Sequence, residues 1–332
     1  MDWTRGRILG RGSSATVSAA FSIRSGQVFA VKSAELPQSG CLQREQRILS
    51  TLSSGHVVSY IGYDITKEDN KLMYNLLMEY VSGGTLSDVI RRCGGKLDEA
   101  AIGFYTWQIV QGLEYLHSIG VVHCDIKPRN ILIGETGAKI ADFGCSTWQN
   151  STAEIGGTPA FMAPETARGE QQGCPADIWA LGCTVIEMVT GESPWRNFAV
   201  DSNPLLILYR IGFSGGSPEI PEFLSGQARD FLTKCLRRDP KERWTAKQLL
   251  KHSFLVEYSN SQTKQIPGFN SNSPTSTLDQ AVWGSDDERE YSGGMNCSSP
   301  AGRVQRLSPY SSEPRWTWDK SWITVRGEGQ CQ

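Results

Sequence analysis

The sequence predicts an α+β fold in which a strand-rich part comes first and a helical part follows. Residues 6–33 are rich in glycine and β-branched residues and alternate in polarity, a pattern typical of strands joined by tight turns. Residues 98–118 instead repeat apolar side chains at helical spacing. A chain of 332 residues is also long enough for two structural units. These observations predict two lobes of different secondary structure.

The strand-rich lobe is expected at about residues 3–80. Its elements, in order, are three strands around Ile8, Thr16–Ala19 and Val28–Lys32, a helix with Leu42, Glu45, Ile48, Leu49 and Leu52 on one face, and two strands at 57–65 and 72–80. The polar run 67–71 is expected to form the turn between the last two strands.

The helical lobe is expected at about residues 82–257. Thr85 is a candidate cap for a short helix that reaches Ile90. The further helices are predicted at 98–118, 177–190, 228–236 and 246–250.

Residues 258–332 form a low-complexity segment rich in Ser, Asn, Gly and Pro, for which we expect a disordered regulatory tail. An aromatic cluster in the tail is a candidate docking site for a regulator or for the chain's own folded part; it comprises Trp316, Trp318, Trp322 and Ile323. Serines that precede proline are either phosphorylation sites or plain turns; they are Ser273, Ser299 and Ser308.

The composition narrows the class of protein. A net charge of −2 gives no electrostatic footprint for nucleic acid or an anionic membrane. The sequence has no signal region and no apolar run of about 20 residues, so no membrane association is expected. The nine cysteines are scattered, without metal-binding or redox spacing. We therefore expect an intracellular protein, in the cytoplasm, the nucleus or both.

Two features of the first lobe could bind phosphate. Gly10 and Gly12 follow a strand, and glycine lets backbone amides approach phosphate oxygens, although Ala15 stands where a third glycine is usual. Lys32 ends a strand that has the composition of a buried one, and Glu45 is its natural partner. The alternatives are an ordinary hairpin and a lysine that reaches the surface.

A set of ordered motifs then indicates the family. Residues 123–130, His-Cys-Asp-Ile-Lys-Pro-Arg-Asn, match the protein-kinase pattern His-Arg-Asp-x-x-x-x-Asn except at Cys124. Asp142-Phe143-Gly144, Ala163-Pro164-Glu165, Asp177 and Arg243 follow in order. Residues 3–257 thus resemble a eukaryotic protein kinase, and the resemblance implies a bilobal protein-kinase fold.

The resemblance also implies ATP and Mg²⁺ as cofactors. Asp125 would accept the proton of the substrate hydroxyl, and Lys127 would neutralise the phosphate. Lys32, held by Glu45, would bind the α- and β-phosphates. Mg²⁺ would be bound by Asn130 and Asp142. The nucleotide would also contact Leu9, Gly10, Gly12, Val17, Ala30, Met78 (the gatekeeper), Glu79, Val81 and Leu132.

Other positions in the same resemblance are structural. A packing spine would contain Leu49, His123 and Phe143, and Glu165 would form a buried ion pair with Arg243.

Finer features indicate the class of substrate. A lysine at the position of Lys127 is typical of Ser/Thr kinases. So is a threonine at the position of Thr158, which is expected to form a hydrogen bond near Asp125 and Lys127. Residues 157–165 are similar to MAP kinase kinase kinases of the MEKK type. Residues 3–6, 123–127 and 142–145 resemble a plant branch of that group. The resemblance implies MAP kinase kinases as substrates, in stress or hormone signalling. The alternative is a kinase-fold scaffold that acts by binding partners through its tail.

One cysteine departs from the pattern, and a second follows Asp142 closely. Cys124 replaces the arginine that pairs with an activation-loop phosphate, so we expect phosphorylation of Ser146, Thr147, Ser151 or Thr152 not to be the main switch. The rival hypothesis is that another basic residue, for example Lys139, supplies that contact. Cys145 is expected to be an inert thiol, with a redox-sensitive one as the alternative.

Overall fold

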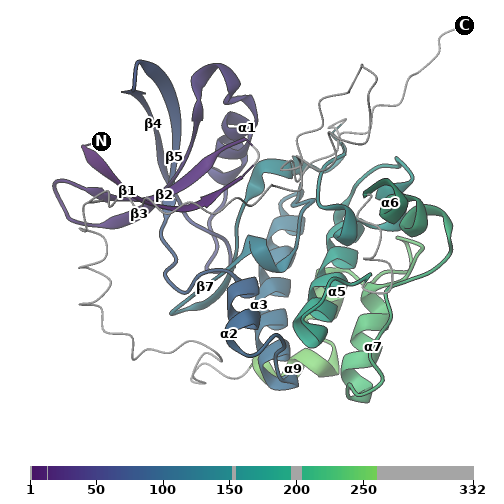
Figure 1. Cartoon of the computed structure of the whole chain (residues 1–332). Coiled ribbons are helices and arrows are strands. Elements are labelled where there is room, and N and C mark those ends of the chain that lie inside the picture. The colour runs from purple at the N-terminus through teal and green to yellow at the C-terminus, as the bar shows by residue number, and fades with distance from the viewer. Residues whose placement is uncertain (1, 13, 152–154, 196–203, 260–332) are drawn as a thin grey trace, which may run out of the picture. The chain divides into compact units, whose positions relative to one another are not determined.

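The computed structural model describes residues 2–12, 14–151, 155–195 and 204–259. In this part a five-stranded sheet that includes one helix in its connections, α1 (Gly40–Leu49), precedes the other α-helices, which confirms the predicted order of strands and helices (Figure 1). None of the described helices is long and apolar enough to cross a membrane. The tail expected at 258–332, with its tryptophans and Ser-Pro steps, lies almost wholly outside the described residues.

The sheet is antiparallel, with the spatial order β1-β2-β3-β5-β4. Its strands are β1 (Trp3–Arg11), β2 (Thr16–Ser22), β3 (Val28–Glu35), β4 (Tyr60–Glu68) and β5 (Lys71–Glu79). Side chains alternate between its two faces. On β3, Ala30 packs in the main core, while Phe29 and Val31 pack in a small cluster with Leu77 and Trp3.

The register of the sheet brings predicted site residues together. Val17 lies opposite Gly10 on one side and opposite Lys32 on the other. Ala30 lies opposite Met78. Residues that are far apart in the chain therefore line one region of the sheet.

The turn between β4 and β5 is shorter than predicted. β4 begins at Tyr60 rather than at 57 and continues to Glu68, so only Asp69 and Asn70 form the loop. Both have positive φ, 46° and 64°. A two-residue hairpin loop requires this conformation, and Asp and Asn tolerate it better than other residues with a side chain.

The helix α1 (Gly40–Leu49) follows the 3₁₀ turn η1 (Leu36–Gln38) and buries the predicted apolar face. Glu45 lies on the same buried face. Leu52 is buried as well, but it lies beyond the end of the helix.

The helical part begins with α2 (Leu86–Arg92) and α3 (Glu99–Ser118). The Thr85 hydroxyl accepts from Asp88 N while the Asp88 side chain accepts from Thr85 N, which forms a capping box. Asp98 caps α3 by accepting from Ala101 N. The remaining helices are α4 (Pro164–Ala167), α5 (Cys174–Thr190), α6 (Pro204–Phe213), α7 (Gly226–Cys235), α8 (Ala246–Leu249) and α9 (Ser253–Ser259).

The helix α5 begins three residues before the predicted start at Asp177. Pro175 is tolerated there because the first turn of a helix needs no backbone N–H donor. Most of α5 is buried around its whole circumference, which is why an apolar run without a polar face forms this central helix (Figure 1).

Short elements between α3 and α4 shape the site. β6 (Val121–Val122) pairs with β9 (Thr147–Trp148), and β7 (Ile131–Gly134) pairs with β8 (Gly137–Ile140). The 3₁₀ turns are η2 (Pro128–Asn130), η3 (Phe143–Cys145) and η4 (Pro159–Phe161). These pairings, together with α4, α6 and α9, were not predicted from the sequence.

Candidate active site

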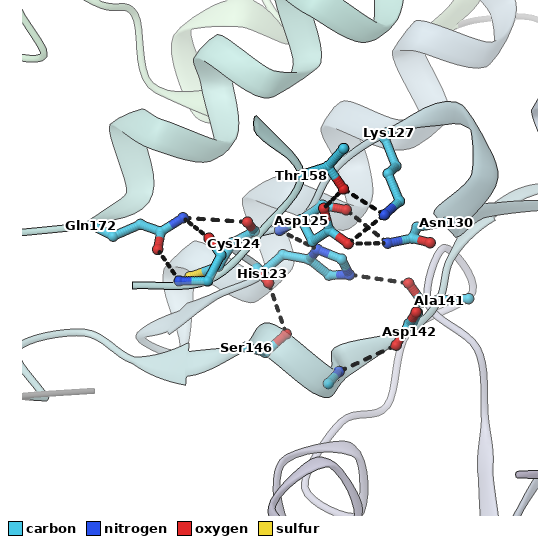
Figure 2. A network of polar contacts seen from close by, with 12 residues as sticks. His123, Cys124, Asp125, Lys127, Asn130, Ala141, Asp142, Ser146, Thr158 and Gln172 are labelled. Carbon is cyan, nitrogen blue, oxygen red and sulfur yellow. Dashed lines mark hydrogen bonds and ion pairs between the residues drawn. The ribbon is translucent and has the colours of Figure 1, made fainter. Parts of the chain in front are cut away.

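Asp125 is the centre of the polar network in Figure 2. The residue is 2% exposed and lies between β6 and η2. Lys127 Nζ and Asn130 Nδ2 donate to Asp125 Oδ2 at 2.8 and 2.9 Å. Thr158 Oγ1 donates to Asp125 Oδ1 at 2.8 Å, and Lys127 Nζ also donates to Thr158 Oγ1 at 2.6 Å. The structure thus places a cation, an amide and a hydroxyl around one buried carboxylate.

His123 has a packing role in this geometry. Asp125 N lies 3.2 Å from His123 Nδ1, and the Ala141 carbonyl oxygen lies 3.1 Å from His123 Nε2. The imidazole meets the Phe143 ring edge to face, with centroids 5.0 Å apart. Both ring nitrogens lie against the backbone, which supports the predicted structural role.

Lys32 joins the sheet to Asp142, the first residue of the activation segment (residues 142–165). Its Nζ lies 2.7 Å from Glu45 Oε2 and 2.8 Å from Asp142 Oδ1. Burial alone would lower the pKa of Lys32, but Asp142 and Glu45 raise it above its ordinary value. Burial would raise the pKa of Asp142, but Lys32 outweighs burial and lowers it to about 2. Lys32 and Asp142 are therefore ionised at neutral pH, whereas burial raises the pKa of the Glu45 carboxyl above its ordinary value despite the contact with Lys32.

The donor set at Asn130 and Asp142 fits Mg²⁺. Asn130 Nδ2 donates to the carbonyl and carboxylate oxygens of Asp125, which turns its amide oxygen away from these acceptors. Among the described residues no group of three or more His, Cys, Asp or Glu side chains could hold a metal alone. Mg²⁺ typically takes one or two protein oxygens together with phosphate oxygens and water, and an amide and a carboxylate meet that requirement.

The glycine loop leaves space beside the sheet. A Cβ atom on Gly10 would meet nothing within 4 Å, and one on Gly12 would meet only the Ala15 carbonyl oxygen at 3.5 Å. Gly12 N donates to Ala15 O at 2.8 Å, which closes the loop. Leu9 is 39% exposed next to it. Backbone without Cβ atoms, as at Gly10 and Gly12, can approach a phosphate closely.

Of the remaining nucleotide candidates, Met78 and Glu79 lie on β5 of the same sheet, whereas Val81 and Leu132 lie outside it. Met78 is buried opposite Ala30 on β5, and Glu79 follows it. Leu132 pairs with Thr85 in an isolated bridge. The Val81 side chain packs close to Gly134 on β7, the strand that contains Leu132.

The structure contradicts the rival role for Lys139. Its Nζ lies 2.6 Å from Glu79 Oε1, in an ion pair of two largely buried side chains. The ammonium group of Lys139 therefore pairs with Glu79 at the end of β5. It is not the missing partner for a phosphate on the activation segment.

Two residues anchor the end of the activation segment. Arg243 Nη1 and Nη2 donate to the two carboxylate oxygens of Glu165 at 2.6 and 2.5 Å, and both side chains are almost fully buried. The guanidinium also lies 5.3 Å from the centre of the Trp179 ring. The expected buried ion pair is present.

Asp177 stands in one of the predicted motifs, but its contact with the backbone of residues 123 and 124 was not predicted from the sequence. Asp177 Oδ2 accepts from His123 N and Oδ1 accepts from Cys124 N, so α5 holds the backbone of residues 123–130, the catalytic loop. The apolar run around Asp177 was the available signal. Gln172, which contacts Cys124, was also missed, because a glutamine in a polar loop has no pattern that would reveal its contacts.

Comparisons with known proteins indicate the same family as the motifs whose residues form this site. A family model described as a protein kinase domain matches residues 3–255. Mitogen-activated protein kinase kinase kinase 18 of Arabidopsis thaliana is 50% identical over 341 residues, which cover 98% of this chain and 99% of that protein. Mitogen-activated protein kinase kinase kinase 17 of the same plant is 51% identical over 312 residues, covering 93% and 84%. Mitogen-activated protein kinase kinase kinase 4 of Homo sapiens is 39% identical over 270 residues, which cover 76% of this chain but 16% of that protein.

Proposed function

This chain belongs to the protein kinase family, and we propose that it is a Ser/Thr-specific MAP kinase kinase kinase that transfers the γ-phosphate of ATP to MAP kinase kinases. One observation supports the transfer of phosphate to serine or threonine. The hydroxyl of Thr158 reaches both Asp125 and Lys127, so a short side-chain hydroxyl fits between the carboxylate and the ammonium. The relatives, which match along nearly the whole chain, support the substrate class through their names.

The described residues divide the reaction between them. Asp125 would orient the acceptor hydroxyl and take its proton, while Lys127 would neutralise the phosphate as it moves. Lys32, fixed by Glu45, would hold the α- and β-phosphates of ATP. Mg²⁺, held by Asn130 and Asp142, would supply positive charge against the phosphates. Phosphoryl transfer depends mainly on such positioning and charge.

The adenine would lie between the sheet and β7. Val17 and Ala30 from the sheet and Leu132 from β7 would enclose the base, with Met78 as the gatekeeper. The backbone of Glu79 and Val81 would supply hydrogen bonds. The Lys139–Glu79 ion pair supports this assignment, because it fixes the end of β5 where these backbone groups lie.

The biological setting is part of the same proposal. An intracellular location, in the cytoplasm, the nucleus or both, accords with the need for ATP and with the free cysteines among the described residues. A role in stress or hormone signalling rests on the resemblance alone.

A transfer assay tests the proposal. Purified full-length chain, labelled ATP and Mg²⁺ are incubated with an inactive MAP kinase kinase, and the labelled amino acids are identified. We expect label on serine or threonine, with a loss of at least about 100-fold for Asp125→Asn and Lys32→Met because each removes a charge at the reacting groups.

Two results would contradict it. If the wild-type chain transfers no more label than Asp125→Asn, the scaffold alternative is favoured. If it labels a generic acceptor such as casein but no MAP kinase kinase, the chain is a kinase with other substrates.

A further inference from the structure

We propose that Gln172 is a positioning residue that fastens the activation segment to the catalytic loop without any phosphate. This inference rests on the proposed kinase function. Gln172 lies in the loop between α4 and α5, outside every predicted site motif. It supplies the link that arginine and a phosphorylated loop provide in kinases that have arginine where this chain has Cys124.

Three hydrogen bonds define this link. The Gln172 amide and the peptide group of Gly156 exchange two of them: Gly156 N donates to Oε1 at 3.3 Å, and Nε2 donates to Gly156 O at 3.2 Å. Nε2 also donates to Cys124 O at 3.3 Å (Figure 2). One neutral side chain thus joins the activation segment and the catalytic loop.

The backbones at this junction are in close contact. A Cβ atom on Gly157 would lie 2.5 Å from the Cys124 carbonyl oxygen, and φ of Gly157 is 122°. Only glycine fits there without a shift of the backbone. The activation segment therefore runs directly against the catalytic loop at the point that Gln172 bridges.

The link fixes the residue that contacts the catalytic pair. Thr158 follows Gly157 and donates to Asp125, and it accepts from Lys127. On the other side of Thr158, Trp195 Nε1 donates to Ala160 O at 3.0 Å. Gln172 and Trp195 thus hold the backbone on both sides of Thr158. Release of Gly156 would let Thr158 and the acceptor-binding surface shift relative to Asp125.

Two variants separate hydrogen bonding from packing. Gln172→Ala removes all three bonds. Gln172→Glu has the same shape and still accepts from Gly156 N, but it has no donor for the two carbonyl oxygens. The control is Gln171→Ala, because Gln171 is exposed. If the bonds matter, both Gln172 variants are impaired and the control is not.

The first measurement is independent of activity. We expect hydrogen exchange at the amide of Gly156 and its neighbours to be at least 10-fold faster in Gln172→Ala than in Gln171→Ala, in the full chain without ligand. Unchanged protection at these amides would overturn the link whatever the activity.

The second measurement is transfer to casein and to a MAP kinase kinase after phosphatase treatment. We expect treated wild type to stay active, and kcat/KM for the acceptor to fall about 10- to 100-fold in both Gln172 variants, as for the loss of two or three neutral hydrogen bonds. KM for ATP and the unfolding temperature are expected to stay near the wild-type values.

Three outcomes overturn the proposal: inactivity of the treated wild type, full activity of both Gln172 variants, or a parallel loss of ATP binding and thermal stability. If the wild type, treated or not, labels no acceptor, the proposed function fails instead. The exchange measurement still decides whether Gln172 makes the link.

Discussion

At residue 124 the backbone, rather than the side chain, makes the contacts that organise the catalytic loop. The residue has φ of 68°, its N–H donates to Asp177, and its carbonyl oxygen accepts from Gln172. Burial, with Asp177 adding to it, raises the pKa of the Cys124 thiol well above its usual range. A neutral, buried thiol offers no partner for a phosphate, unlike an arginine.

The activation segment should therefore not need phosphorylation. We expect the quadruple variant Ser146→Ala, Thr147→Ala, Ser151→Ala, Thr152→Ala to retain at least about a third of wild-type phosphate transfer. The reason is that no arginine precedes Asp125 to bind a phosphate on these residues. Initial rates of purified protein check this. Complete loss of activity would show that one of these hydroxyls is needed.

Cys145 should be an unreactive thiol. Burial, together with Asp125 and Asp142, raises its pKa, so little thiolate forms near pH 8. Timed alkylation with N-ethylmaleimide should label the exposed Cys41 and Cys93 at least about 10-fold faster than Cys145. Mass spectrometry of the peptides measures the rates, with denatured protein as the reference. Equal rates in the native protein would favour the redox-sensitive alternative.

At the scale of elements, local sequence signals set where helices begin, whereas non-local contacts set which short strands pair. Thr85 and Asp98 cap their helices as side chains of their type do, so these helix starts could be predicted to within about a residue. The two-residue pairing of β6 with β9 could not, because neither strand has a pattern and each depends on the other. The start of α5 was misplaced because Pro175 was not recognised as a first-turn residue.

The C-terminal end of α5 offers a test of backbone geometry. Gly191 ends the helix with φ of 73°, and a Cβ atom there would lie 1.8 Å from the Gly95 carbonyl oxygen. Gly26 has a similar φ of 68° with open space around it. We expect Gly26→Ala to lower the free energy of unfolding by about 1 kcal/mol and Gly191→Ala by clearly more, because the second adds a steric clash to the conformational cost.

Denaturant unfolding of both variants measures the difference. Equal losses of stability would mean that the loop at Gly95 moves away freely, and that the close approach seen in the structure adds nothing to the conformational cost.

At the scale of the whole described part, contacts between distant segments hold the site together. The main core is one apolar cluster that includes Leu49 of α1, Phe143 of η3 and Trp179 of α5. The Glu165–Arg243 ion pair joins the end of the activation segment to a residue shortly before α8. The site thus depends on packing that spans most of the described chain.

Breaking that ion pair should destabilise the fold. Arg243→Met leaves the carboxylate of Glu165 buried without its partner, and we expect a loss of about 3–5 kcal/mol in the free energy of unfolding. The double variant Glu165→Met, Arg243→Met should lose less than Arg243→Met alone, because no charge is left unpaired. Thermal and denaturant unfolding measure both.

The control is Glu170→Ala, which removes an exposed partner of Arg168 and should change the unfolding midpoint little. A loss for Arg243→Met no larger than that of the control would show that the buried pair does not anchor the activation segment.

The sequence by itself determined the family and the fold class, and it predicted most residues of the proposed site. Phosphoryl transfer requires particular residue types, and these occur in a fixed order along the chain. The residues that match this order are Lys32, Asp125, Asn130 and Asp142. The order of strand and helix patterns follows from the periodicity of apolar residues, which is a local property.

Only the tertiary structure decided which partners these residues have. It paired Lys139 with Glu79 rather than with the activation segment, and it brought Gln172 to Gly156 and Cys124. Such contacts join residues from separate elements, and neither charge nor spacing in the sequence specifies which of many polar side chains will meet. Packing of the core brings them together, and burial then makes each hydrogen bond or ion pair matter.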